Sequence, residues 1–103
     1  MFEKSFRLSV LTMDKVAFEG DVVSVVTPGS MGSFGVLAGH APLVSSLERG
    51  ILKLRYLDNR EEFITISGGF IEVNKKGEVI ILADSAEKTS YPKSPQMTVP
   101  SPN

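Results

Sequence analysis

His40 is the residue with the clearest potential for chemistry, because it is the only histidine in the chain of 103 residues. A metal site built on several histidines is therefore impossible. The chain also contains no cysteine, which removes thiolate ligands, thiol nucleophiles and disulfides. A Ser-His-Asp triad could be assembled from Ser45 and His40, but the sequence has no Gly-x-Ser-x-Gly motif to present the serine. Taken alone, His40 is interpreted as a loop or surface histidine satisfied by a hydrogen bond.

Three glycines, Gly29, Gly32 and Gly35, have the composition of a phosphate-binding loop but not its spacing. They lie three residues apart, no Gly-Lys-Ser/Thr sequence follows, and no helix is expected after them. We interpret this segment as a loop that needs positive φ at several positions.

The adjacent acids Glu61 and Glu62 begin an expected strand, where neighbouring side chains point to opposite faces, so they do not pair for acid–base catalysis. We interpret Glu62 as a solvated surface charge and place Glu61 in the preceding turn. The sequence therefore predicts no catalytic residue, no cofactor site and no metal site.

Alternation with a period of two runs through most of the chain. Phe6, Leu8 and Val10 alternate with polar residues, as in a strand with one buried face. Similar runs, separated by turn signals, cover residues 22–27, 52–56, 63–67, 70–73 and 79–82. This spacing predicts an all-β, two-sheet β-sandwich of about ten short strands. Gly68-Gly69 marks a β-bulge or a close approach of another backbone, or else a tight hairpin turn.

Composition narrows the class of partner. The formal net charge of −1 lacks the basic excess of a nucleic-acid binder. No apolar run approaches the ~20 residues of a membrane span, so membrane contact is expected only through a partner. We predict a folded domain over residues 1–87. Residues 88–103 contain four of the six prolines and are predicted to form a flexible tail.

Several segments form a specific combination when they are taken in order. Gly-His-Ala-Pro-Leu at 39–43 precedes Ser-Gly-Gly at 67–69 by about 25 residues, and Ala-Asp-Ser-Ala follows at 83–86. Together with residues 6–11, 16–20 and 22–26, this order resembles the epsilon subunit of F-type ATP synthases, called delta in mitochondria. The resemblance covers residues 5–87.

The resemblance implies a non-catalytic rotor subunit at the foot of the central stalk, on the cytoplasmic face of the bacterial inner membrane. In that family the domain binds the gamma subunit and the polar loops of the c-ring, and helps couple proton flow to ATP synthesis. Family members often have an acidic residue where Ser33 stands, so an ion pair with basic ring loops is missing here and Met31 would supply an apolar contact instead. The matching ring-facing positions are Met31, Gly32, Ser33 and His40. The gamma-facing positions are Ala41, Pro42, Leu43, Ser45, Ser67, Gly68 and Gly69.

The chain departs from the family pattern after Ala86. Most members continue into a two-helix hairpin that inhibits ATP hydrolysis, whereas a proline-rich segment follows here. We therefore expect a subunit that couples without the helical inhibitory mechanism. The alternative is a stand-alone β-sandwich module for peptide or carbohydrate, which would need an aromatic-lined groove from a chain without tryptophan. If the chain binds a protein partner, we expect an exposed apolar patch around residues 31–43.

Overall fold

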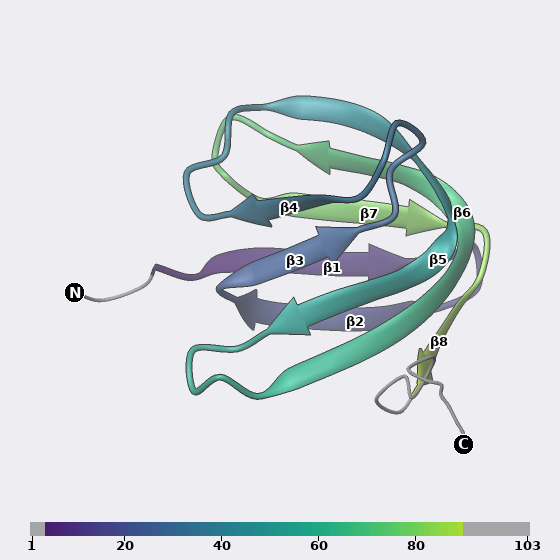
Figure 1. Cartoon of the computed structure of the whole chain (residues 1–103), viewed down its shortest axis with the longest axis horizontal. Helices are drawn as coiled ribbons and strands as arrows, with labels where there is room; N and C mark the ends of the chain where they lie inside the picture. Colours follow the sequence, from purple (N-terminus) through teal and green to yellow (C-terminus); the bar gives the residue numbers. More distant parts are fainter. Residues whose placement is uncertain (1–3, 90–103) are drawn as a thin grey trace, which may run out of the picture.

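The computed structural model describes residues 4–89, which form strands joined by turns (Figure 1). No helix within this range is long and apolar enough to cross a bilayer. The eight strands are β1 (Phe6–Leu11), β2 (Val16–Val22), β3 (Ser24–Thr27), β4 (Phe34–Leu37), β5 (Leu43–Arg55), β6 (Glu61–Val73), β7 (Val79–Ala83) and β8 (Ala86–Thr89).

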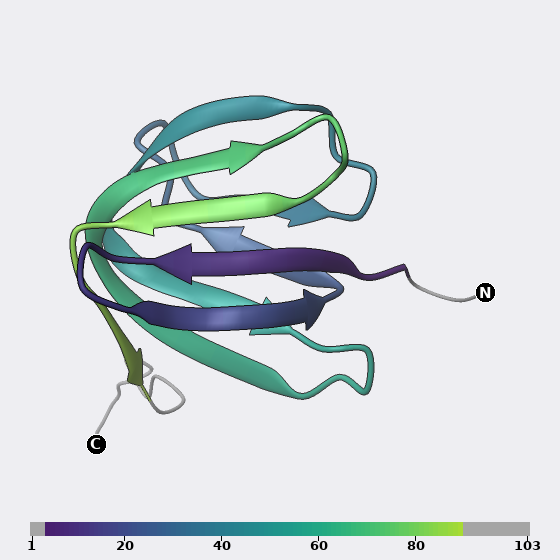
Figure 2. The ribbon, with the colours of Figure 1, turned by 180° about the vertical axis from the view of Figure 1, so that it is seen from behind.

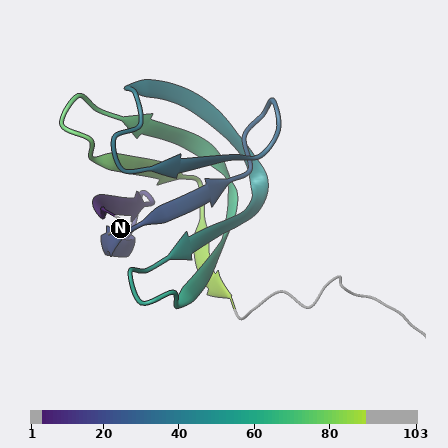
Figure 3. The ribbon, with the colours of Figure 1, turned by 60° about the vertical axis from the view of Figure 1, so that its left-hand side comes forward.

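Two long strands fold the single hydrogen-bonded sheet into two layers. The strand order is β2-β1-β7-β6-β5-β3-β4, with β8 also pairing to β6. β5 and β6 have 13 residues each and curve together around one side of the molecule (Figures 1 and 2). Their bend joins the layers, as the view in Figure 3 shows. The predicted all-β sandwich is confirmed; if β5 and β6 are each counted as two, the eight strands become the ten expected.

The first layer contains β2, β1 and β7 with the second half of β6 and the first half of β5. The second layer contains the other halves of β5 and β6 with β3, β4 and β8. Fully buried side chains from both layers, including Leu8, Ile81, Leu52 and Ile64, meet between them. Each such side chain contributes about 1.5–3 kcal/mol by its removal from water. This core holds the two layers together and fixes the position of the bend.

Gly68 and Gly69 lie at the bend of β6, in a continuous strand. On either side of Gly68, Leu47 pairs with Gly69 and Arg49 pairs with Ser67. A Cβ atom on Gly69 would lie 2.0 Å from the carbonyl oxygen of Leu82, so only glycine lets β7 approach this closely. The close-approach interpretation is confirmed at Gly69, and the hairpin-turn alternative is wrong because β6 is continuous here.

β8 extends two residues beyond the predicted domain boundary at residue 87. Lys88 pairs with Ile64 and Thr89 with Phe63. Residues 90–103, the rest of the predicted tail, lie outside the described residues.

Glu62 is a structural link between β8 and the β5–β6 hairpin, which corrects its interpretation as a solvated charge. The Tyr56 hydroxyl donates a hydrogen bond to Glu62, and the Lys88 ammonium lies 3.1 Å from its other oxygen. The hydrogen bond from Tyr56, with help from Lys88, lowers the pKa of Glu62 in spite of partial burial. Burial and the same hydrogen bond raise the pKa of Tyr56 to about 12. Glu61 also differs from its predicted place, since it begins β6 opposite Arg55.

Glu62→Gln is expected to lower the free energy of unfolding at pH 7 by about 1–2 kcal/mol, because a charged acceptor is lost. The folded-state pKa of Glu62 lies below its ordinary value of 4.5. Its carboxylate therefore stabilises the fold above that value, and the contribution disappears as the pH falls through the lowered pKa. Urea denaturation at pH 7 and pH 3 measures the difference. Glu61→Gln is the control, since within residues 4–89 the side chain of Glu61 binds only Lys53, at 3.4 Å. A pH-independent loss in Glu62→Gln would contradict the prediction.

Candidate functional site

The β3–β4 loop, residues 28–33, is tied to the bend of β5. The Glu48 amide donates to the Pro28 carbonyl at 2.7 Å, and the Ser30 amide donates to the Ser46 carbonyl at 3.3 Å. The hydroxyl oxygens of Ser30 and Ser46 are 2.7 Å apart. A further bridge pairs Gly29 with Leu47. These contacts hold the loop in one conformation against the second layer.

The tip of this loop presents Met31, whose side chain is 100% exposed. Gly32 and Ser33, the next two predicted ring-facing residues, are also exposed. Of the three glycines expected to need positive φ in this segment, only Gly32 has it, at 119°. The structure thus brings three of the four predicted ring-facing residues together in an ordered projection.

His40, the fourth predicted ring-facing residue, lies at the other end of the β3–β4 hairpin. Thr27 pairs with Phe34 beside the loop, and Ser24 pairs with Leu37 at the far end, just before His40. The length of β4 alone separates the two ends by about 10 Å. His40 is half-buried and its Nδ1 lies 2.7 Å from the Ala41 carbonyl oxygen. The structure therefore does not bring His40 next to Met31.

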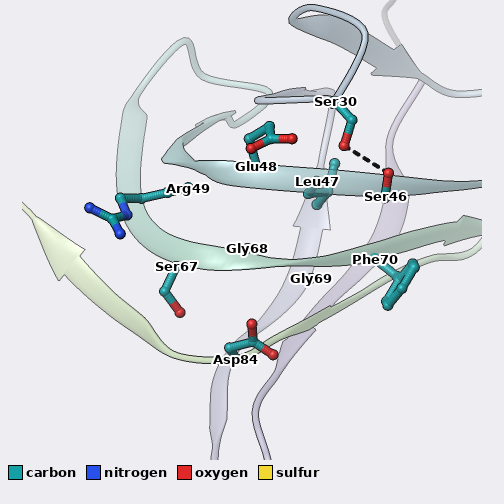
Figure 4. Close-up of a pocket in the computed structure, with 10 residues that line it drawn as sticks. All are labelled: Ser30, Ser46, Leu47, Glu48, Arg49, Ser67, Gly68, Gly69, Phe70 and Asp84. Atoms are coloured by element: carbon teal, nitrogen blue, oxygen red, sulfur yellow. Dashed lines mark hydrogen bonds between the residues drawn. The ribbon is translucent and has the colours of Figure 1, made fainter.

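A polar cleft of about 660 Å³ opens at the bend of β5 and β6 (Figure 4). Ser67, Gly68 and Gly69, which belong to the predicted gamma-facing set, line it. Ser67 is exposed and its hydroxyl accepts a hydrogen bond from Ser85 at 2.9 Å. Gly68 is buried and Gly69 is half-buried, and the backbone that approaches Gly69 closely is that of β7 in the same chain.

The other predicted gamma-facing residues continue from this cleft along the paired strands β5 and β6. Ser45 pairs with Ile71 and Leu43 with Val73, in register with the pairing of Leu47 and Gly69 at the bend. Ala41 and Pro42 are exposed, whereas Leu43 and Ser45 are half-buried. The structure therefore arranges this set along one edge of the first layer, with Ser67 at one end and Ala41 at the other.

Sequence reasoning missed several residues of the cleft, including Ser30, Ser46, Glu48 and Asp84. Ser30 and Ser46 come together only through tertiary packing, so no local pattern could have found them. Asp84 could have been identified from the sequence, because it belongs to the Ala-Asp-Ser-Ala segment on which the family resemblance partly rests. Its position opposite the bend comes from a backbone hydrogen bond, in which the Asp84 amide donates to the Gly68 carbonyl at 3.0 Å.

Two carboxylates of the cleft, Asp84 and Glu48, have no side-chain hydrogen bond or ion pair within residues 4–89. Most acidic side chains elsewhere in this range are paired; for example, Arg7 binds both Glu19 and Asp21. Arg49 also lines the cleft but forms no ion pair with either acid among the described residues. Across residues 4–89, no group of three or more metal-ligating side chains gathers closely enough to hold an ion. The arrangement offers backbone, hydroxyl and carboxylate contacts to a partner.

Residues 5–89 match the family model for the beta-sandwich domain of the ATP synthase delta/epsilon chain. The ATP synthase epsilon chain of Dichelobacter nodosus is 40% identical over 85 residues, which cover 82% of this chain and 59% of the relative. The epsilon chain of Moorella thermoacetica is also 40% identical, with 63% of its length covered. This chain thus spans about three fifths of those two relatives. The epsilon chain of Chlorobium limicola is 38% identical over 82 residues, which cover 80% of this chain and 93% of the relative.

Solved structures show the same architecture. A chain in the mitochondrial ATP synthase of Euglena gracilis, solved as an OSCP/F1/c-ring assembly, superposes with a TM-score of 0.78 and 30% identity. The match covers 85% of this chain and 56% of that chain. A chain in the central stalk/c-ring structure of Tetrahymena thermophila ATP synthase gives a TM-score of 0.71 at 13% identity, over 96% of this chain and 82% of that one. The second likeness is evidence for the fold alone.

Proposed function

Since this chain belongs to the ATP synthase delta/epsilon chain family, we propose that it is a non-catalytic subunit of the central stalk of a proton-translocating ATP synthase. In this role it binds the gamma subunit and the c-ring, turns with them, and helps couple proton flow to ATP synthesis. Its place is the cytoplasmic face of a bacterial inner membrane, where the complex holds it peripherally. The observation that carries the proposal is the family match over residues 5–89, almost the whole described domain.

The gamma-facing surface that we propose is the edge that begins at the cleft. Ser67 is its exposed polar residue, and Gly68 and Gly69 line the cleft beside it without side chains that would fill it. The surface continues along the first half of β5 through Ser45 and Leu43, and then to Pro42 and Ala41, which precede the strand. Small side chains at both ends favour close packing over a contact made by a few long side chains.

The proposal is tested by co-elution of the purified chain with the gamma subunit of the same organism at micromolar concentration. Ser67→Arg is expected to weaken that complex roughly 30-fold or more, because a long charged side chain would fill the contact. Thr65→Arg is the matched control, since Thr65 is exposed on the same strand two residues away and points to the same face. It should change the dissociation constant by no more than about threefold.

If both wild-type proteins are folded and migrate separately, the proposed function fails. A recognition module for peptide or carbohydrate then becomes the hypothesis to pursue. If they bind but Thr65→Arg weakens the complex as much as Ser67→Arg does, the rotor assignment stands and the proposed face is wrong.

The ring contact that we propose uses the tip of the β3–β4 loop. Met31 offers a fully exposed apolar side chain, with Gly32 and Ser33 beside it. Hydrogen bonds to Ser46 and Glu48 hold the loop before binding, which reduces the entropy lost on association. His40 forms a second, separate contact at the far end of the same hairpin.

A further inference from the structure

β7 is apolar on both of its faces, although the described residues cover only one of them. Val79, Ile81 and Ala83 point into the core, so Ile80 and Leu82 point to the opposite face of the first layer. Leu82 is 54% exposed. β7 is a central strand that pairs in parallel with β1 on one side and antiparallel with β6 on the other. Apart from the β1–β7 pair, the described strands pair antiparallel, and antiparallel sheets commonly leave one face open to solvent. That open face is ordinarily polar, so the apolar side chains on the outer face of β7 are the unusual feature within residues 4–89.

Leu82 is the centre of an apolar row that crosses three strands. Its partner on β1 is Leu11 and its partner on β6 is Phe70, which is 58% exposed. We call these three residues the outer row. A shallow groove of about 290 Å³ runs along the outer row, and the fully exposed Met13 also lines it. Exposed apolar residues gathered in this way mark an interaction surface more often than scattered ones do.

The outer row is continuous with the cleft at the bend. Gly69, Phe70 and Asp84 line both the groove and the cleft. The Asp84 carboxylate, which lacks a partner within residues 4–89, therefore lies where the apolar groove meets the polar cleft. A protein seated on the cleft would meet this negative charge and the outer row together.

We propose that the outer row is a docking surface for a segment of the same stalk partner that occupies the cleft. That segment presents apolar side chains to Leu82 and Phe70 and a lysine or arginine to Asp84. The inference rests on the proposed binding of the gamma subunit, and it extends the contact from the edge formed by β5 and β6 across the face of β7. The shared lining residues and the unpaired carboxylate indicate this occupant.

The test measures the dissociation constant of the complex with the gamma subunit for three variants. Leu82→Glu is expected to weaken binding roughly 30-fold or more, because it buries a charge in an apolar contact. Leu37→Glu is the matched control: Leu37 is 57% exposed but lies on β4 in the second layer. Asp84→Asn should weaken binding and also reduce its dependence on salt, because an ion pair is lost. Thermal melting of each free variant shows that the fold is kept, and Leu82→Ser replaces Leu82→Glu if that variant melts early.

The outcomes separate this inference from the proposed function. If the wild-type chain does not bind the gamma subunit, the proposed function itself fails. If it binds and Ser67→Arg weakens the complex, but Leu82→Glu and Asp84→Asn do not, the outer-row inference is overturned while the rotor assignment stands. A wild-type homodimer that Leu82→Glu dissociates would also overturn it, by showing a second copy on the row. The inference is also overturned if a chain that ends at Thr89 binds the gamma subunit far more tightly than the full chain does, and Leu82→Glu abolishes only this increase in affinity. That result would show that the outer row is occupied by the chain's own C-terminal segment and not by the partner.

Discussion

Gly69→Ala is expected to lower the free energy of unfolding by about 3 kcal/mol or more, because no side chain fits at this position. The new Cβ would lie 2.0 Å from the Leu82 carbonyl oxygen and 2.8 Å from the Cα of Ala83, both of them backbone atoms that no rotamer change can move. The φ angle of 149° adds backbone strain. The bend of β6 would have to move away from β7, which would disturb the cleft and the outer row together.

Gly68→Ala is the matched control for this variant. Gly68 has a similarly positive φ, 118°, but its Cβ would meet the Leu47 carbonyl oxygen at 3.5 Å, an ordinary contact. It should lose only the cost of strain, about 1–2 kcal/mol. Urea denaturation of the three chains gives both differences. Equal losses in the two variants would show that strain, and not the close approach of β7, is what requires glycine at the bend.

Gly29→Ala is expected to weaken binding of the c-ring roughly tenfold, through displacement of the loop that carries Met31. A Cβ on Gly29 would lie 2.7 Å from the Gly32 carbonyl oxygen and 2.7 Å from the ring of Phe34. The loop must open to admit it, which moves Met31 from its ordered position. Titration of the complex of this chain and the gamma subunit against detergent-purified c-ring measures the effect.

Gly35→Ala tests whether any added methyl group on the same hairpin has this effect. The nearest atoms to its Cβ would be 3.9 Å away, so the change fits without movement. Its ring affinity should match that of the unchanged chain. Full ring affinity in Gly29→Ala, with the loop shown by NMR shifts to have moved, would contradict the proposed contact at Met31.

Most of the fold prediction rested on the alternation of apolar and polar residues. The pattern of Phe6, Leu8 and Val10 identified β1 and its buried face, and the run at 79–82 identified β7 to within one residue. The predicted run at 22–27 is divided between β2 and β3, and neither β4 nor β8 was predicted as a strand. Periodicity did not reveal that β5 and β6 continue through both layers, because a bend between two runs of alternation has the same pattern as a turn. Only the pairing of Leu47 with Gly69 and Arg49 with Ser67 across the bend shows one continuous ladder.

The candidate site was predictable in part, and only where neighbours in space are also neighbours in sequence. Met31, Gly32 and Ser33 form one exposed tip because a loop presents consecutive residues together. His40 was grouped with them as ring-facing, and only the structure shows that the length of β4 separates it from the loop tip. Glu62 was misjudged for the opposite reason, since Lys88 reaches it from a strand that is distant in sequence.

The sequence by itself determined the class of fold, the family and the positions of several strands, because backbone geometry imposes a local period of two on any strand with one buried face. The tertiary structure alone decided which apolar side chains stay exposed. The run Val79–Ala83 is apolar throughout, and nothing local shows whether Leu82 lies under another strand or faces outward. That depends on what packs against the sheet from elsewhere in the chain, and within residues 4–89 nothing covers this face of β7.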